Sequence, residues 1–238
     1  MKSPYGLDII ESCLSCTMRQ DYLFCNLAPA SLKTLEAIKT TASYPKGALL
    51  FVEGQLPRGI FVVCSGRAKL TTTSKEGKSI IIRIAEAGEV LGLSAAVSGK
   101  PYEVTAELLE PTQANFIRRQ DFLDFMQKHG DAALRVAQEL SKNYHSAYEE
   151  IRSLGLSRSA TEKLVKLLLE WEDRGGKGSS HGKITVALTH EEIAQLIGSS
   201  RETVTRIFAD LKRRKLIAVK GSSISLKDHD ALAAMVSS

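Results

Sequence analysis

Apolar residues between positions 27 and 119 recur in short runs separated by glycine. Runs rich in β-branched and aromatic side chains are typical of strands, and the glycines between them mark turns. Repeated short strands of this kind predict a β sandwich or a barrel-like β domain, preceded by a helix at 31–38. The expected strands are 49–52, 60–64, 68–71, 80–84, 104–106 and 114–117.

The hydrophobic period changes over residues 120–156, which we predict to form one long helix. Small or apolar residues follow one another there at alternating steps of four and three residues, as in an a/d seam: Ala133, Ala137, Leu140, Tyr144, Ala147, Ile151 and Leu154. Such a seam packs either on the chain's own β domain or on the same helix of a second copy. Alanine permits close helix approach, so we favour a parallel homodimer.

The last part of the chain, residues 157–238, has the pattern of a winged helix-turn-helix. Thr189 and Glu192 have the spacing of a capping box, and the helix that they begin stops at Gly198. A second helix opens at once, with Ser199 and Glu202 again at capping-box spacing. Two helices joined by a tight turn form a helix-turn-helix, and the β-hairpin expected at 216–226 is its wing.

These patterns predict an α+β chain of four parts. They are a cysteine-containing segment at 1–26, a β domain at 27–119, a long helix at 120–156 and a winged helix-turn-helix at 157–238.

Composition narrows the function classes. Hydrophobic residues make up 43% of the 238 residues and charged residues 25%, as in ordinary globular proteins. No apolar run approaches the roughly 18 residues that cross a bilayer, and the N-terminus lacks the apolar stretch of a signal peptide, so we expect a cytoplasmic protein that does not enter a membrane. The net charge is +5, and residues 157–238 hold 14 of the 32 Lys and Arg but 10 of the 27 Asp and Glu. A basic last third is compatible with nucleic-acid binding, with an acidic membrane surface or with solubility alone.

The order of these parts resembles the CRP/FNR family of bacterial transcription regulators, from about Leu27 to the end of the chain. The most specific segment is 198–206, Gly-Ser-Ser-Arg-Glu-Thr-Val-Thr-Arg, which is similar to the recognition helix of the cyclic-AMP receptor branch. The resemblance implies a cyclic-nucleotide-binding-like β-roll, a dimerisation helix and a winged helix-turn-helix. It also implies a homodimer that binds double-stranded DNA.

The same resemblance implies a TGTGA-like half-site. Arg201 and Arg206 would read guanines and Glu202 would accept from a cytosine amino group, which suits the hydrogen-bonding edges of those bases. Alternatively, Glu202 only closes a capping box and the arginines are a solvated face. The expected DNA-contacting residues, including those holding phosphates, are Ser200, Arg201, Glu202, Thr203, Thr205 and Arg206.

The nucleotide site departs from the cyclic-AMP branch. Residues 88–92 resemble the start of the phosphate cassette, but Leu93 stands where an acidic residue holds the ribose, and Val104 stands where an arginine holds the phosphate. Glu103 is beside it. Burying an anionic phosphate without a cation is unfavourable, so the sequence argues against cyclic AMP unless Arg83 reaches in from a neighbouring strand.

All four cysteines lie in the first 64 residues: Cys13, Cys16, Cys25 and Cys64. Clustered cysteines in a reducing compartment more often bind metal or act in redox chemistry than form disulfides. The FNR branch carries an iron–sulfur cluster on three N-terminal cysteines and one from the β-roll, and the resemblance implies such a cluster here. The gap before Cys25 is longer than in that branch, and Asn115 stands where the fourth ligand aligns, which leaves Cys64 as the fourth thiolate. A structural zinc site, a thiol switch and simple packing remain alternatives.

No enzymatic motif is present, and we expect His181, His190 and His229 to be surface residues. The resemblance places the Gly/Ser-rich loop 175–182 where family members touch RNA polymerase. Two rival functions stay open: a cyclic-nucleotide-responsive regulator, and a sensor or interaction module without specific DNA binding.

Overall fold

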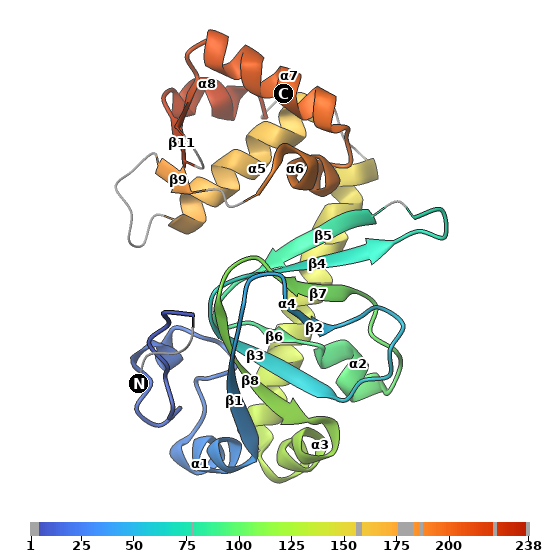
Figure 1. Ribbon diagram of the computed structural model, residues 1–238. Helices are drawn as coiled ribbons and strands as arrows, with labels where there is room; N and C mark the ends of the chain where they lie inside the picture. The colour runs from blue at the N-terminus through green and yellow to red at the C-terminus, as the bar shows by residue number, and fades with distance from the viewer. Residues whose placement is uncertain are drawn as a thin grey trace. The chain divides into compact units, whose positions relative to one another are not determined.

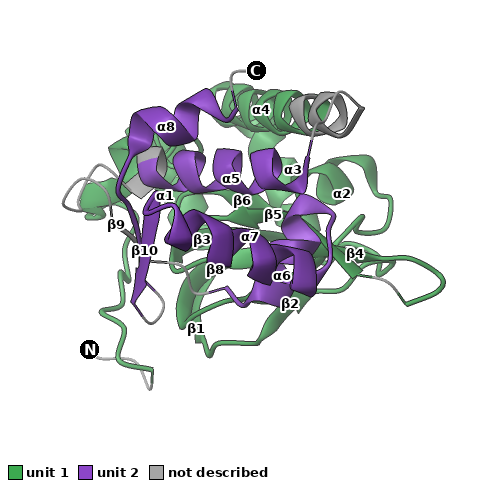
Figure 2. Ribbon diagram, turned by 90° about the horizontal axis from the view of Figure 1, so that it is seen from above, with its two compact units in different colours: residues 1–150 green, residues 151–238 purple. Residues whose placement is uncertain are grey.

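The computed structural model describes residues 5–77, 79–155, 159–175, 183–185, 188–220 and 223–236, without the side chains of 149–155, 173–175 and 183–185 (Figure 1). The chain divides into two compact units, Met1–Glu150 and Ile151–Ser238 (Figure 2). Each unit has its own buried cores, and each is described by itself below.

Unit 1 contains the expected β-roll. Its helices are the 3₁₀ helix η1 (Thr17–Gln20), α1 (Pro29–Ile38), α2 (Leu93–Ser98), α3 (Arg119–Lys128) and α4 (Gly130–Gly155), which crosses the boundary between the units after Glu150. Its strands are β1 (Lys39–Tyr44), β2 (Leu49–Phe51), β3 (Gly59–Ser65), β4 (Ala68–Thr73), β5 (Ser79–Ala85), β6 (Val90–Leu91), β7 (Thr105–Leu108) and β8 (Thr112–Arg118). They form two four-stranded antiparallel sheets, in the orders β1-β8-β3-β6 and β2-β7-β4-β5.

The alternation of side chains along β3 divides the core of the roll. Phe61 and Val63 point into the space between the two sheets, while Ile60 and Val62 point outward, where they pack with α1, α3 and α4. A strand that is apolar on both faces is expected where both faces are covered, and this explains the unbroken apolar run at 60–64.

Two strands of the roll carry no apolar alternation and were not expected. β1 reads Lys-Thr-Thr-Ala-Ser-Tyr, a polar run that becomes a strand because it pairs along its whole length with β8. β6 has two residues, which pair with β3 at Phe61 and Val62. Tertiary pairing, rather than local propensity, forms both strands.

The single helix expected over 120–156 is wrong, because the segment forms two helices, α3 and α4. His129, between them, has an extended backbone. The Ser31 hydroxyl lies 3.1 Å from His129 Nδ1 and donates to Asp131 Oδ1 at 2.6 Å, and Asp131 Oδ2 accepts from the Ala28 amide at 2.9 Å. These bonds tie the start of α1 to the break, so the change of direction is fixed by polar contacts on both sides of it.

Unit 2 folds as the expected winged helix-turn-helix. Its elements are α5 (Ala160–Gly175), β9 (Lys183–Thr185), α6 (His190–Ile197), α7 (Arg201–Arg213), β10 (Ile217–Lys220), β11 (Ser223–Leu226) and α8 (His229–Ala234). The hairpin β10–β11 pairs Ile217 with Leu226, as predicted, and β9 adds a third, unexpected strand. One core holds α5 to α6 and α7 through Leu164, Leu168, Ile193, Phe208 and Leu211.

Among the described helices, none combines the length and the apolar character that crossing a membrane requires.

Candidate functional site

Only Gly198, Ser199 and Ser200 lie between the end of α6 and the start of α7. The predicted capping box at the start of α6 is confirmed: Thr189 Oγ1 accepts from the Glu192 amide at 3.2 Å, and the Glu192 carboxylate accepts from the Thr189 amide at 2.9 Å. α6 ends at Gly198, whose φ of +64° is left-handed. The Ser199 amide then donates to the Ala194 carbonyl at 2.9 Å and closes α6.

The second capping box, expected between Ser199 and Glu202, is wrong. Because the Ser199 amide belongs to the end of α6, Ser200 becomes the N-cap of α7, and its hydroxyl accepts from the Thr203 amide at 3.2 Å. Glu202 therefore does not close a box with Ser199. Its own backbone N–H, and then the Ser200 hydroxyl, hold the pKa of the Glu202 carboxyl below its usual range, so the carboxylate is a charged acceptor.

The N-terminal half of α7 presents an open polar face. Arg201, Glu202, Thr205 and Arg206 are exposed, whereas the opposite face of the helix is buried. Within the described residues, neither the Arg201 nor the Arg206 guanidinium forms a salt bridge, and both keep all their donors for a ligand. Further along the helix the situation differs, because Arg213 and Arg214 both pair with Asp210.

His190 is a residue of this site whose role the sequence did not reveal. It is exposed, as expected, but its Nδ1 lies 2.9 Å from Thr205 Oγ1, and its ring stacks on Phe208 with an interplanar angle of 3° and a centroid distance of 5.0 Å. The first residue of α6 thus contacts two successive turns of α7. Thr205 is on the expected DNA face, but its hydroxyl already has a partner in the protein.

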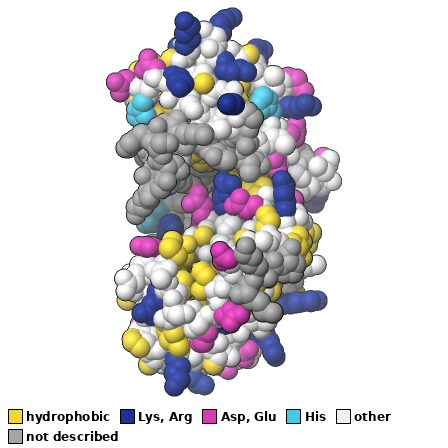
Figure 3. Space-filling view, turned by 60° about the vertical axis from the view of Figure 1, so that its left-hand side comes forward, with side chains coloured by type: hydrophobic (Ala, Val, Ile, Leu, Met, Phe, Trp, Pro, Cys, Tyr) yellow, Lys and Arg dark blue, Asp and Glu magenta, His cyan; other side chains and the backbone are white. Residues whose placement is uncertain are grey.

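Positive side chains are spread over the surface of unit 2. Figure 3 shows dark blue Lys and Arg side chains over the part of the molecule that contains α7 and α8. The charged side chains of α7 and of the turn after it include Arg201, Arg206, Lys212, Arg213, Arg214 and Lys215, against Glu202 and Asp210. A surface with this excess of positive charge suits a polyanion.

In unit 1, the cysteine-containing segment is held on β8 and α1 by polar contacts. The side chain of Gln113, which is fully buried, donates to the Ile10 carbonyl at 2.7 Å and accepts from the Ile10 amide at 2.8 Å. Glu36 accepts from the Cys13 amide at 2.8 Å, and the Lys39 ammonium donates to the Glu11 carbonyl at 2.7 Å. These bonds fix the place of Cys13 on the outer face of the sheet.

Cys64 lies next to the position where the resemblance placed a fourth ligand. In the register of β3 and β8, Val62 pairs with Asn115, and a bulge follows at Cys64, between Val63 and Ser65. Asn115 itself reaches the N-terminal segment, because its Nδ2 donates to Cys13 Sγ at 3.6 Å. Cys64 and Asn115 therefore occupy neighbouring positions on adjacent strands, although they are far apart in the sequence.

Cys13 and Cys25 pack against the same core of unit 1, on the outer side of β3 and β8. Burial raises the pKa of Cys13 to about 11 and that of Cys64 to about 12, and it also raises the pKa of Cys25. For each of these three, negative charge on neighbouring thiols adds to the rise, and Cys16 contributes to all three. Four thiols fit the donor set of an iron–sulfur or zinc site. In the described part of the chain, however, no three His, Cys, Asp or Glu side chains are already arranged to hold a metal ion.

Known proteins resemble the chain over nearly its whole length. Residues 41–129 match the cyclic nucleotide-binding domain, and residues 162–235 match the Crp-like helix-turn-helix domain. The transcriptional activator protein FnrL of Cereibacter sphaeroides is 30% identical over 220 residues, which are 90% of this chain and 86% of that protein. The transcriptional activatory protein AadR of Rhodopseudomonas palustris is 27% identical and covers 92% of each chain. The chain belongs to the CRP/FNR family of transcription regulators.

The solved structure of FixK2 from Bradyrhizobium japonicum supports the fold of this CRP/FNR regulator, with a TM-score of 0.75 at 20% identity over 84% of this chain and 98% of that one. The predicted fold class is confirmed, and so is the function as a DNA-binding transcription regulator.

In the phosphate cassette of this CRP/FNR regulator, the two positions that hold the nucleotide in the cyclic-AMP branch are occupied by Leu93 and Val104. Arg83, the one arginine that could have replaced the missing one, forms a salt bridge with Glu89. Leu93 follows the left-handed Gly92 and is buried at 2% exposure, so it offers no polar group. Glu103 accepts from the Ser94 hydroxyl at 2.8 Å, which puts a carboxylate at the start of α2.

Helix α4 packs on its own β-roll along one face and exposes an apolar stripe along another. Ala132, Val136 and Glu139 are buried, and Leu140, a residue of the predicted seam, packs partly against the same core. The exposed stripe contains Leu134, Ala137, Tyr144 and Tyr148; Leu134 is 59%, Tyr144 66% and Tyr148 60% exposed. Ala147 is also exposed, and the side chains of Ile151 and Leu154 lie outside the described residues. The stripe is thus rotated from the predicted seam, away from Leu140.

Glu139 is a buried carboxyl that the sequence pattern gave no reason to single out. It is 3% exposed on the inner face of α4. Burial raises its pKa, Glu89 adds to the rise, and Lys142 and Arg83 oppose it. Its charge in turn contributes to the raised pKa of Cys25, so Glu139 links α4 electrostatically to both the cassette and the cysteines.

Proposed function

We propose that this regulator binds a palindrome of TGTGA-like half-sites as a homodimer. The observation that carries the proposal is the open face of α7, where two arginines that have no salt-bridge partner among the described residues flank an ionised Glu202. In a helix-turn-helix, the N-terminal part of the second helix enters the major groove.

Each base-reading role follows from the donors and acceptors of the side chain. Arg201 and Arg206 each offer a fork of N–H donors, which matches the O6 and N7 acceptors of guanine. Glu202 only accepts, which suits the cytosine amino group. Ser200 and Thr203 lie at the N-terminus of α7, where hydroxyl and amide groups hold phosphates. Thr205 contributes mainly by holding α7 on α6, because its hydroxyl is bonded to His190.

The homodimer is supported by the exposed stripe of α4. An apolar stripe along a helix of 26 residues, with two tyrosines exposed to 60% or more, is costly in water and favourable when a second copy covers it. Two copies related by twofold symmetry also match the symmetry of a palindrome.

We further infer that an iron–sulfur cluster is the signal, with Cys13, Cys16 and Cys25 as ligands and Cys64 as the fourth. Cys13 and Cys25 pack on one core, and Asn115, whose neighbour across the strands is the bulge at Cys64, donates from its amide to Cys13 Sγ, as groups that tune such clusters do. A bound cluster would supply an oxygen-labile link between the N-terminal segment and β3. Because the thiols are not yet arranged around one point, the segment would adjust on binding.

Cyclic AMP control is the alternative, and the occupied Arg83 and the carboxylate of Glu103 disfavour it. Contact with RNA polymerase through the loop at 175–182 remains a prediction, since residues 176–182 lie outside the described part.

Selection from a random duplex library tests the proposal. The protein, prepared with and without oxygen, should enrich TGTGA-like half-sites about one helical turn apart, and binding should fall steeply with salt. Sedimentation of the free protein gives its oligomeric state, and calorimetric titration with cyclic AMP tests the alternative. Enrichment of no motif under either condition would overturn sequence-specific binding.

A further inference from the structure

A cavity of about 420 Å³ opens into the β-roll and shares Tyr102 with the loop that follows α2. Its walls come from β1, β2, β3 and β8, from the loop between β2 and β3, and from Tyr102 in the loop between α2 and β7. None of its lining residues is a cysteine. Cavities of about 300–1,000 Å³ are the size that small-molecule ligands occupy. The cavity is therefore a candidate ligand site that contains no cysteine and adjoins the cassette at Tyr102, next to Gly92.

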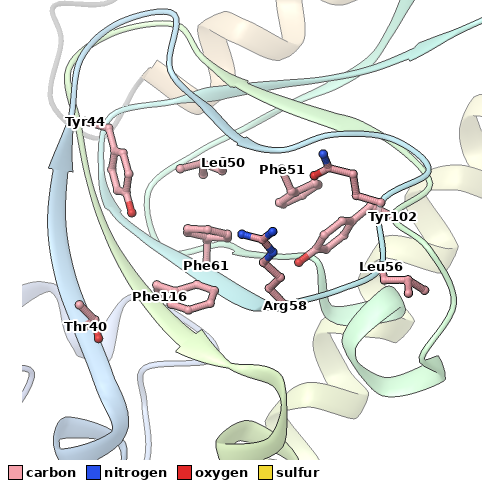
Figure 4. A pocket seen from close by; sticks show the side chains of 10 residues that line it. Thr40, Tyr44, Leu50, Phe51, Leu56, Arg58, Phe61, Tyr102 and Phe116 are labelled. Atoms are coloured by element: carbon pink, nitrogen blue, oxygen red, sulfur yellow. The ribbon is translucent and has the colours of Figure 1, made fainter.

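Aromatic rings form the inner wall of this cavity. Phe51 stacks on Tyr102 with centroids 4.1 Å apart, and Phe61 lies 4.9 Å from Phe116 and 6.2 Å from Phe51. Tyr44 closes the side formed by β1 (Figure 4). Ring faces in such an arrangement accept a flat apolar group by stacking or by edge-to-face contact.

One cation reaches into this apolar space. Figure 4 shows the side chain of Arg58 pointing into the cavity between Phe61 and Tyr102. In the part of the chain that the structure describes, no acidic side chain forms a salt bridge with Arg58. The Tyr102 hydroxyl is already bonded, since it donates to the Gly59 carbonyl at 2.8 Å. Arg58 is an exposed residue, so its guanidinium lies at the mouth of the cavity and is available to a ligand that enters from solvent.

We propose that this cavity binds a small planar organic carboxylate, with its ring among the aromatic side chains and its carboxylate on Arg58. A guanidinium is planar and pairs with a carboxylate through two parallel hydrogen bonds, which gives both affinity and orientation. A single cation matches a single negative charge, so a monocarboxylate fits better than a nucleotide with its phosphate and polar sugar. The Thr40 hydroxyl and the Gln55 amide lie among the remaining lining residues and are available for a ring substituent.

Calorimetric titration of the full chain with 2-naphthoate tests the proposal, with 2-naphthamide as a ligand of the same shape without charge. We expect saturable binding of the acid and at least about tenfold weaker binding of the amide, which corresponds to the loss of one charge-assisted hydrogen-bonded pair. Arg58→Gln should weaken 2-naphthoate binding by a similar factor and leave the weak amide binding unchanged.

Arg118→Gln is the matched control. Arg118 ends β8, its side chain is 81% exposed, and it does not line the cavity, so its loss removes the same charge without removing the ligand contact. A Phe116→Ala variant should weaken the acid and the amide alike, because it removes part of the ring-binding wall. Absence of saturable 2-naphthoate binding, or equal weakening by Arg58→Gln and Arg118→Gln, would overturn the proposal. The titrations contain no DNA, so they are independent of the proposed operator.

Discussion

His190 Nδ1 lies 2.9 Å from Thr205 Oγ1, so the first residue of α6 is hydrogen-bonded to the middle of α7. The same imidazole lies flat on Phe208, which is buried in the core of unit 2. The recognition helix is therefore positioned from its exposed side as well as from its buried side.

Replacing His190 with alanine removes both contacts. We expect the free energy of unfolding of unit 2 to fall by about 1–2 kcal/mol, from one neutral hydrogen bond and one ring pair. Urea denaturation followed by the fluorescence of Trp171 measures this, because Trp171 is the only tryptophan of the chain and packs against the core of unit 2. A double-mutant cycle with Thr205→Val should give a coupling of about 0.5–1.5 kcal/mol. Purely additive effects would show that the hydrogen bond does not contribute.

Arg201→Ala should cost ~1–3 kcal/mol of operator binding and relax the preference at one guanine of each half-site. The reason is that no other described group holds the Arg201 guanidinium, so its donors are free for a base. Binding to a panel of single-base operator variants measures the change. Lys33→Ala removes an equal charge from exposed α1 and should leave the base preference unchanged. Unaltered base preference in Arg201→Ala would remove Arg201 from the reading role.

Tyr144→Asp should dissociate the homodimer. The change puts a carboxylate on the exposed stripe of α4 in both copies at once, and unpaired like charges at an interface are strongly unfavourable. Sedimentation at micromolar concentration should give a monomer, and operator affinity should collapse because one half-site holds the protein weakly. Ser146→Asp, on an exposed position away from the stripe, is the matched control. A Tyr144→Asp protein that still sediments as a dimer would place the interface elsewhere.

Cys16→Ser and Cys64→Ser should each abolish the brown chromophore of protein purified without oxygen. A four-iron cluster generally needs four thiolates, and the chain has only four cysteines. Operator affinity of both variants should no longer respond to oxygen. Ser15→Ala, in the same segment as Cys16, should keep the colour and the iron and sulfide content. Colourless, iron-free wild-type protein from a strictly anaerobic preparation would rule out the cluster and leave zinc or a thiol switch.

Glu139→Gln should stabilise unit 1 at neutral pH. Burial raises the pKa of Glu139, so the folded state favours the protonated carboxyl. The contribution of Glu139 to stability is therefore full below its ordinary pKa of 4.5 and is lost as the pH rises through its folded-state value. The advantage of Glu139→Gln should be largest at pH 7 to 8 and disappear near about pH 4, as measured by urea denaturation and circular dichroism. The exposed Glu11→Gln is the control, and an advantage that does not change with pH would contradict the explanation.

The sequence pattern predicted those parts of the fold in which local signals and tertiary packing agree. The apolar strand at 60–64 and the capping box at Thr189 are examples, because the residues that determine each of them are close together in the sequence. β1 was missed because its residues become a strand only through pairing with β8, about 70 residues away. The break at His129 was missed because the bonds that fix it come from Ser31 and Asp131, which no periodicity connects.

The candidate site shows the same division. The open face of α7 follows from helical spacing, so Arg201, Glu202 and Arg206 could be predicted as one surface. The neighbourhood of Cys64 could not, because it depends on the register of β3 against β8 and on a bulge. Glu139 and His190 could not be singled out for a related reason. Their roles depend on residues of other elements, which are Glu89 and Arg83 for Glu139 and Thr205 for His190.

The turn between α6 and α7 has a consequence for chain length. The Ser199 amide belongs to α6 and the Ser200 hydroxyl to α7, so no residue between the two helices is left unassigned. One inserted residue would separate the Ser199 bond that closes α6 from the Ser200 cap that begins α7, so the turn would need another conformation and α7 would leave α6 in another direction. A change in the length of 198–200 should therefore disturb the direction of the recognition helix more than a substitution at one of its exposed positions does.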